Sequence, residues 1–152
     1  MKKLFIGVLL LGLCLPVYAA DNQLETFISG FNYEARKDMQ IKSKDLIKLL
    51  KEGKAQLIDI RFPEEYSVWK VGPSKSIPLS ELPKRLSEID KSKIVVTACP
   101  HKDRAAIAMV YLRSKGIPAK YLSDGLIGLA ENLRGDDAKE FNEAIGKFKG
   151  NK

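Results

Sequence analysis

Three short apolar segments along the chain predict β-strands. Residues 56–60 (QLIDI) and 93–98 (KIVVTA) combine large aliphatic with β-branched residues, and residues 119–123 (AKYLS) follow a Gly-Ile-Pro turn signal. Short, nearly continuous apolar runs are typical of strands that are covered on both faces of a parallel sheet. We expect residues 56–60 and 93–98, the strongest of these runs, to be neighbouring central strands.

Apolar residues at helical spacing occur between and after these strands. Ser43 is expected to cap a helix that Gly53 ends. The clearest helical pattern of the chain begins at Arg104 and is followed by Gly116 and Pro118. One face of that predicted helix carries four apolar residues, as its period requires: Ala105, Ala108, Met109 and Leu112.

The other segments complete an alternating order of strands and helices. A short helix is expected within residues 79–89, with loops or turns over residues 63–78 and 124–129. Parallel strands need crossover connections, so this order predicts an α/β fold, a mostly parallel central sheet with helices on both faces. The expected organisation is an N-terminal extension, residues 20–40, a main domain, residues 41–135, and a C-terminal helix, residues 136–152.

The first nineteen residues have the pattern of a secretory signal peptide. Two lysines precede a twelve-residue apolar stretch, residues 4–15, and cleavage is expected after Ala19. Twelve residues are too few for a membrane-spanning helix, which needs about 20. Cys14 follows a leucine rather than the small residue of a lipoprotein signal. The protein is therefore expected to be periplasmic or secreted, with no stable membrane anchor.

The mature chain would be a single basic domain. Residues 20–152 are long enough to bury a core, and without the two signal lysines they keep 24 basic and 19 acidic residues, a net charge of +5. The charges are mixed along the sequence and form no basic cluster interleaved with aromatics. This distribution argues against a nucleic-acid partner and suits a small anionic ligand.

Cys99 would be the only cysteine of the mature chain, and His101 is the only histidine in the sequence. An odd cysteine in an exported chain has no internal disulfide partner, so it is either a buried structural residue or a working thiol. One cysteine and one histidine do not complete a zinc site. We therefore expect neither a metal nor a cofactor.

The position of Cys99 favours the working thiol. It follows a predicted strand directly, at the end where open α/β sheets bind ligands, and a helix begins a few residues later. The N-terminus of a helix stabilises a thiolate, and Lys102 and Arg104 would add positive charge for an anionic substrate. Plainer interpretations stay open: Arg104 as the partner of an acid, and Lys102 and His101 as exposed loop residues.

The segment CPHKDR, residues 99–104, resembles the active-site loop of single-domain rhodaneses, with four residues between the cysteine and the arginine. Phosphatases of the same fold have one residue more in this loop. Three further segments are similar to family motifs in the same order: LIDIRFPEEY, WKVGPSKSIPL and YLSDGL. The resemblance covers about residues 40 to 135, and the chain is identified as a rhodanese of the small exported type.

The resemblance implies a sulfurtransferase. A small anionic sulfur compound, such as thiosulfate or polysulfide, would give sulfane sulfur to Cys99, and a thiol or protein acceptor would remove it from the persulfide. Arg104, Lys102 and His101 are the expected substrate-binding residues. The alternative is a sulfur carrier or a rhodanese-like binding module without catalysis.

Two features lie outside this expected chemistry. Asp59 and Arg61, just after the first strong strand, are expected to brace the fold through a buried ion pair or loop hydrogen bonds rather than to touch substrate. For residues 21–40 two roles stay open, packing on the domain or forming a contact in a homodimer.

Four positions depart from the family's usual sequence. Lys102 stands where the loop usually has a glycine, Asp124 replaces the first glycine of the closing Gly-Gly turn, and Trp69 and Lys70 replace a Gly-His pair. If the loop position requires a positive φ, the lysine is expected to be strained there.

Overall fold

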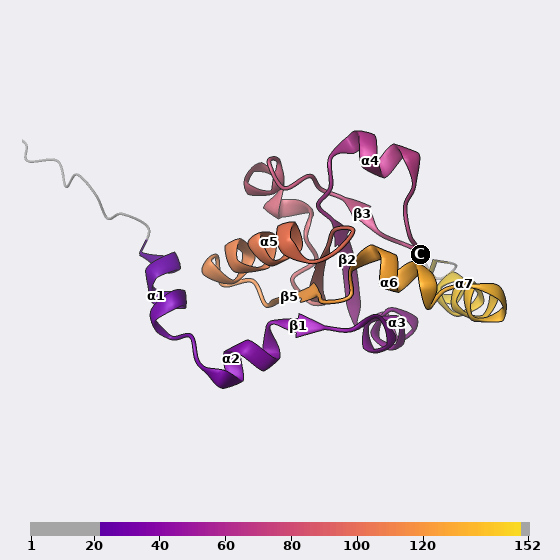
Figure 1. Ribbon diagram of the computed structural model, residues 1–152, viewed down its shortest axis with the longest axis horizontal. Helices are drawn as coiled ribbons and strands as arrows, with labels where there is room; N and C mark the ends of the chain where they lie inside the picture. Colours follow the sequence, from indigo (N-terminus) through magenta and orange to yellow (C-terminus); the bar gives the residue numbers. More distant parts are fainter. Residues whose placement is uncertain (1–21, 150–152) are drawn as a thin grey trace, which may run out of the picture.

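The computed structural model describes residues 22–149, so the expected signal peptide lies outside the described residues. Five parallel strands form one sheet in the order β1-β5-β4-β2-β3 (Figure 1). β2 and β4 pair along their whole length and lie inside the sheet, which confirms the prediction that they are neighbouring central strands. The strands are β1 (Gln40–Ile41), β2 (Ala55–Asp59), β3 (Lys75–Ser76), β4 (Ile94–Ala98) and β5 (Ala119–Leu122).

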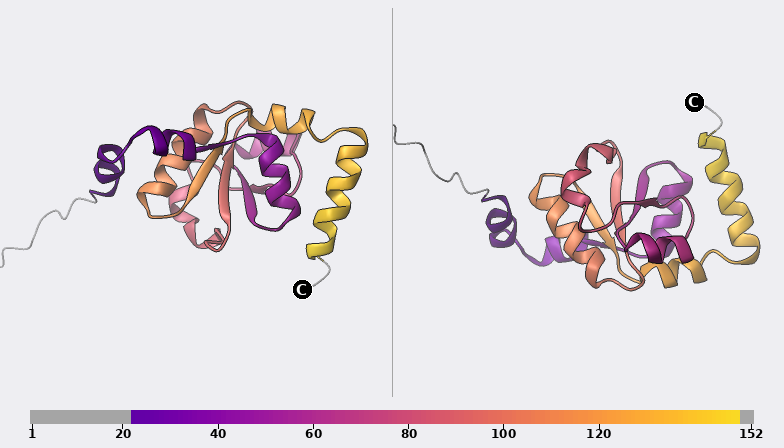
Figure 2. Two further views of the ribbon diagram at one scale, coloured as in Figure 1. Left: turned by 90° about the horizontal axis from the view of Figure 1, so that it is seen from below. Right: turned by 90° about the horizontal axis from the view of Figure 1, so that it is seen from above.

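Helices lie on both sides of this sheet (Figures 1 and 2), so the predicted α/β fold is confirmed. Two short 3-10 turns, η1 (Leu82–Lys84) and η2 (Leu86–Glu88), occupy the place of the predicted short helix. The α-helices are α1 (Gln23–Ser29), α2 (Tyr33–Asp38), α3 (Ser43–Lys51), α4 (Pro63–Val68), α5 (Asp103–Ser114), α6 (Gly125–Glu131) and α7 (Gly135–Lys149).

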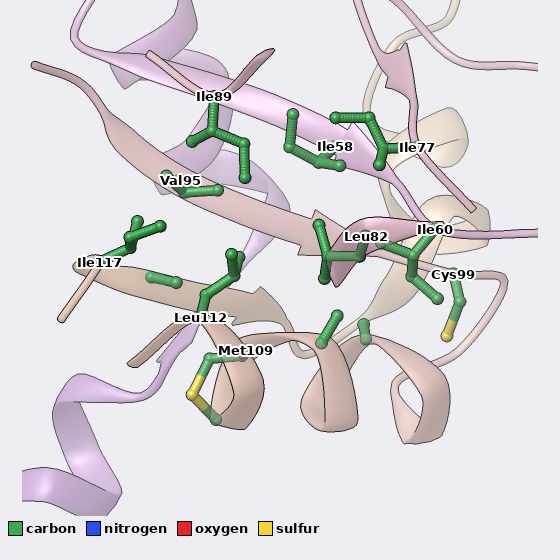
Figure 3. Packing of buried hydrophobic residues seen from close by; sticks show 13 residues of the cluster. Ile58, Ile60, Ile77, Leu82, Ile89, Val95, Cys99, Met109, Leu112 and Ile117 are labelled. Atoms are coloured by element: carbon green, nitrogen blue, oxygen red, sulfur yellow. The ribbon is translucent and has the colours of Figure 1, made fainter. Parts of the chain in front are cut away.

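Successive side chains of the central strands point to opposite faces of the sheet, so neighbouring residues belong to two separate hydrophobic cores. Ile58 and Val95 pack with α5 and the η1–η2 segment on one face (Figure 3). Leu57 and Val96 pack on the other face with α3, α6 and Phe141 of α7. This two-sided burial explains why both strands read as nearly continuous apolar runs.

Two segments predicted as loop or turn are helical. In α4, Pro63 occupies the first helical position, where a missing N–H costs nothing, and Glu65 accepts a hydrogen bond from the Phe62 N–H at 3.3 Å. In α6, Gly125 has a φ of +66° and starts a seven-residue helix, in which Leu126 and Leu129 are buried. Proline and glycine mark helix starts as well as turns, so the sequence pattern alone was ambiguous at both places.

The expected N-cap role of Ser43 is wrong. Ser43 is the first residue of α3 rather than its cap, and its buried hydroxyl has no hydrogen-bond partner within the described residues. Instead, its backbone N–H donates to both carboxylate oxygens of Asp124, at 3.1 and 3.2 Å. The N-terminus of α3 is thus capped by an acid of the β5–α6 turn, and the positive end of the helix dipole stabilises the negative charge of that acid.

The N-terminal extension forms α1 and α2, at the opposite end of the molecule from α7 (Figures 1 and 2). α1 contacts α5, and Asn32 caps α2 by accepting a hydrogen bond from the Ala35 N–H at 2.9 Å. Several large apolar side chains of this extension are exposed: Leu24, Ile28, Phe31 and Tyr33. Across residues 22–149, none of the helices is both long and apolar enough to cross a membrane.

A fully buried ion pair braces the carboxyl end of β2. The Arg61 Nη2 lies 2.6 Å from the Asp59 Oδ2, and neither side chain is exposed to solvent. The same nitrogen donates to the Trp69 carbonyl at 2.7 Å, and the Arg61 guanidinium stacks 4.1 Å from the centre of the Trp69 ring. Trp69 therefore anchors the chain that leaves α4, and Asp59 and Arg61 hold the end of β2 and the end of α4 together.

We predict that Asp59→Asn lowers the free energy of unfolding by about 3–5 kcal/mol, because it leaves the buried guanidinium without its counter-charge. Urea unfolding at pH 7 measures the effect. The control is Asp38→Asn, since Asp38 pairs with Arg113, at 2.6 Å, and with Lys120, at 2.5 Å, but its side chain is 62% exposed. Loss of each such exposed pair costs about 1 kcal/mol or less. Equal losses in the two variants would contradict the bracing role of Asp59.

Candidate active site

Cys99 follows β4 directly, and its side chain is completely buried. Figure 3 shows it at the edge of the core cluster, beside the start of α5. Its Sγ donates a hydrogen bond to the Asp103 Oδ1 at 3.8 Å. Because Asp103 is the first residue of α5, the sulfur lies at the N-terminus of that helix, as the sequence predicts.

Backbone hydrogen bonds from α6 hold the loop that carries Cys99. The Leu126 N–H donates to the Cys99 carbonyl at 2.8 Å, and the Ile127 N–H donates to the Pro100 carbonyl at 3.4 Å. Gly125 makes this approach possible, because a Cβ there would lie 2.2 Å from the Pro100 carbonyl oxygen and 2.3 Å from that of His101. The turn at Asp124 and Gly125, in the segment YLSDGL, therefore supports the cysteine loop.

His101 and Lys102 are exposed residues of the loop. Lys102 has a φ of −150°, outside the left-handed region, so the strain expected from a lysine at this position is absent. The lysine precedes α5 at the N-cap position without a side-chain capping bond. Both residues remain candidates for contact with a substrate that approaches the loop from solvent.

Arg104 is paired with an acid from a distant part of the chain. Its Nη1 lies 2.6 Å from the Glu65 Oε2, and its Nη2 lies 3.0 Å from the Glu65 Oε1. These hydrogen bonds lower the pKa of Glu65 and raise the pKa of Arg104 from their ordinary values. The guanidinium also lies 5.8 Å from the centre of the exposed Phe62 ring. The pair joins α4 to α5 at the cysteine loop.

Sequence reasoning missed two carboxylates of this site. Glu65 was visible in the segment LIDIRFPEEY, but its partner lies 39 residues away in the sequence. Asp103 was visible as an acid directly before the predicted helix, a position that usually has only a dipole role. Asp59 and Arg61 bind each other, as described above. Within residues 22–149, no group of three or more His, Cys, Asp or Glu side chains could hold a metal ion.

The part of the chain that carries this site matches a known protein family. A rhodanese-like domain matches residues 42–131, which is more than half of the chain. This chain belongs to the rhodanese family. The match includes β2, the cysteine loop and α6 and leaves α1, α2 and α7 outside.

Other proteins are similar over parts of the rhodanese-like chain. A protein of Bacillus subtilis (strain 168), "Uncharacterized protein YqhL", is 38% identical over 68 residues, 45% of this chain and 54% of that one. This chain therefore spans about half the length of that curated relative. The structure of a "Rhodanese-like Domain Protein from Staphylococcus aureus" is 28% identical, with a TM-score of 0.55, over 59% of this chain and 89% of that chain.

A thiosulfate sulfurtransferase from Pseudomonas aeruginosa has the same fold at lower sequence identity. It is 20% identical, with a TM-score of 0.59, and the match covers 82% of this chain but 27% of that chain. At this identity the likeness concerns the fold alone. It supports the rhodanese-like arrangement of sheet and helices.

We predict that Gly125→Ala destabilises the protein by at least about 2 kcal/mol more than Gly116→Ala, measured by urea unfolding. Both glycines have a positive φ, +66° and +72°, so both substitutions carry a similar backbone cost. Only at Gly125 does the added Cβ meet backbone oxygens, whereas nothing lies within 4 Å of one at Gly116. Overpacking of this kind costs roughly 1–3 kcal/mol or more. Equal losses of unfolding free energy in the two variants would contradict this prediction, because they would mean that the cysteine loop moves away from the added Cβ without cost.

We predict that the Arg104–Glu65 pair contributes about 1 kcal/mol to stability at pH 7, since both side chains are partly exposed. The pKa of Glu65 is lowered in the folded state by its hydrogen bond from Arg104. The contribution is therefore complete above the carboxylate's ordinary pKa of 4.5 and is lost as the pH falls through the lower folded value.

Urea unfolding of wild type and Glu65→Gln at pH 7, 5 and 3 measures this effect. The difference between the two proteins should shrink only at the lowest pH. Glu64→Gln is the matched control, because Glu64 is exposed in the same turn of α4. A difference that stays constant between pH 7 and pH 3 would show that Glu65 stabilises the fold without its charge.

Proposed function

We propose that this rhodanese is an exported sulfurtransferase that moves sulfane sulfur from thiosulfate, polysulfide or a related donor through a Cys99 persulfide to a thiophilic acceptor. The observation that carries the proposal is the position of the Cys99 sulfur. It lies where the carboxyl end of β4 meets the N-terminus of α5, within the part of the chain that matches the family.

This position suits a sulfur nucleophile. The α5 helix is twelve residues long, and the partial positive charge at its N-terminus favours an anion beside it. The loop backbone is fixed by α6, so the sulfur is held in one place before a donor arrives. Fixed geometry of this kind lowers the cost of bringing the two reacting sulfur atoms together.

The proposed reaction has two steps of nucleophilic catalysis. The Cys99 thiolate attacks the outer sulfur of the donor, a new S–S bond forms, and the donor's own bond to that sulfur breaks. The electron pair leaves with the donor fragment, which is sulfite when the donor is thiosulfate. An acceptor thiolate then attacks the outer sulfur of the persulfide and restores the Cys99 thiolate. No oxidant or reductant is consumed.

Export and the single thiol are consistent with this reaction. Export directed by residues 1–19, followed by their removal, would bring the protein to the periplasm or outside the cell, where it would meet inorganic sulfur compounds. The mature sequence holds no second cysteine that could convert the persulfide into an internal disulfide. The persulfide would therefore persist until an external acceptor removes it.

The burial of Cys99 favours a second candidate function. A sulfur with no exposed surface and an Arg104 already bound to Glu65 would suit a sulfur carrier or a binding module that does not turn over small donors. The two functions differ in what happens after loading. A carrier holds its sulfur until one partner arrives, whereas an enzyme releases it repeatedly to a general thiol.

Intact-mass spectrometry of the purified protein before and after exposure to polysulfide tests the proposal. We predict a gain of one sulfur, about 32 Da for the persulfide of the covalent mechanism, that cyanide removes and that Cys99→Ser lacks. The same spectrum tests cleavage after Ala19. Repeated turnover with excess donor and thiol supports the enzyme, and stable loading without turnover supports the carrier. Absence of any adduct on wild type would overturn both the enzyme and the carrier and would favour the binding module.

A further inference from the structure

We propose that Asp103 sets the donor specificity of this site, so that Cys99 takes sulfur from persulfides, R–S–SH, in preference to thiosulfate. This inference rests on the proposed function, because it concerns the donor that loads Cys99. It starts from the hydrogen bond between the Cys99 sulfur and the Asp103 carboxylate, 3.8 Å long.

Asp103 lies beside the atom on which the transferred sulfur would be loaded. A persulfide places its outer sulfur about 2 Å from the cysteine Sγ, so an outer sulfur on the side of Asp103 lies within contact distance of this carboxylate, which is itself 3.8 Å from Sγ. Asp103 is exposed to solvent, whereas Cys99 is not. An incoming donor therefore meets this carboxylate while it approaches the thiol.

The positive charge near the loop is already balanced. Arg104 forms two hydrogen bonds to Glu65, and the charge of Lys102 is matched by the adjacent Asp103. Arg61 is bound to Asp59 inside the core. The sequence suggested a cationic site for an anion, but the four charges of Lys102, Asp103, Arg104 and Glu65 sum to zero.

The two donor classes differ in charge and in hydrogen-bond capacity. Thiosulfate is a dianion at neutral pH and leaves as sulfite, so it brings negative charge against Asp103. In its protonated form, R–S–SH, a persulfide carries an S–H on the sulfur to be transferred, and in its ionised form it carries a single negative charge. An ionised carboxylate is purely a hydrogen-bond acceptor. Asp103 would therefore accept a hydrogen bond from the persulfide donor and repel thiosulfate.

The persulfide step balances without a further reactant. The Cys99 thiolate attacks the outer sulfur of R–S–SH, the bond between the two donor sulfurs breaks, and R–S⁻ leaves with the electron pair. The hydrogen stays on the transferred sulfur, giving Cys99–S–SH, whose S–H faces Asp103. The R–S⁻ fragment takes the proton that the Cys99 thiol gave up.

The experiment measures the rate at which Cys99 gains one sulfur from thiosulfate and from cysteine persulfide, with intact-mass detection. Each rate is divided by the rate of the same donor with free cysteine, which removes intrinsic reactivity. The variants are Asp103→Asn, Asp103→Glu and Asp136→Asn. Asp136 is an exposed acid in the first turn of α7, so its variant has the same net charge as Asp103→Asn.

We expect Asp103→Asn to load about tenfold faster from thiosulfate, as one screened charge–charge interaction at short range allows. Its rate with cysteine persulfide should be unchanged or lower. Asp103→Glu and Asp136→Asn should keep the donor preference of wild type. When ionic strength rises from about 0.01 to 0.15 M, thiosulfate loading should slow more in Asp103→Asn than in Asp136→Asn, because Lys102 is then unbalanced.

A wild-type protein that prefers thiosulfate over cysteine persulfide would overturn the inference. So would equal acceleration with both donors in Asp103→Asn, which would mean a general effect on the thiol, or the same change in Asp136→Asn. In each of these outcomes Cys99 still takes up sulfur, so the proposed function stands. Failure of wild type to load from either donor would instead refute the proposed function itself.

Discussion

The contact between the Gly125 backbone and the carbonyls of Pro100 and His101 is the constraint on which the site depends. It lets α6 begin directly against the cysteine loop, where its first amides bind the carbonyls of Cys99 and Pro100. The neighbouring Asp124 caps α3 from the same turn. One short segment after β5 therefore fixes the loop, a helix on the opposite face of the sheet and the place at which the thiol meets α5.

The parts that could be predicted from the sequence are those with a local cause. The apolar pattern of each of the elements β2, β4 and α5 lies within about ten residues of sequence, so the buried face of each can be predicted locally. The order of these elements along the chain then predicts a parallel sheet. Cys99 at a strand end follows from the same pattern. β1 and β3 escaped prediction because each has only two residues in the sheet, too few to show any periodicity.

The parts that could not be predicted depend on side chains that meet from distant segments. Glu65 neutralises Arg104 across 39 residues, and Asp124 caps α3 across 81 residues. Neither pairing leaves a trace in local spacing. The electrostatic character of the site was consequently misjudged: counting Lys102 and Arg104 suggested a cationic pocket, while the folded chain surrounds the thiol with balanced charges and one carboxylate in direct contact.

The position of β1 has a consequence for the order of folding. Gln40 pairs with Tyr121, 81 residues later, so the first strand of the chain remains without its partner until the last strand exists. Joining such distant residues costs loop entropy, which favours assembly of β2, β4 and β5 before β1 is added. Until then β5 is an open sheet edge, a surface on which another chain can add a strand. A chain that began after residue 41 would keep that edge of β5 unpaired.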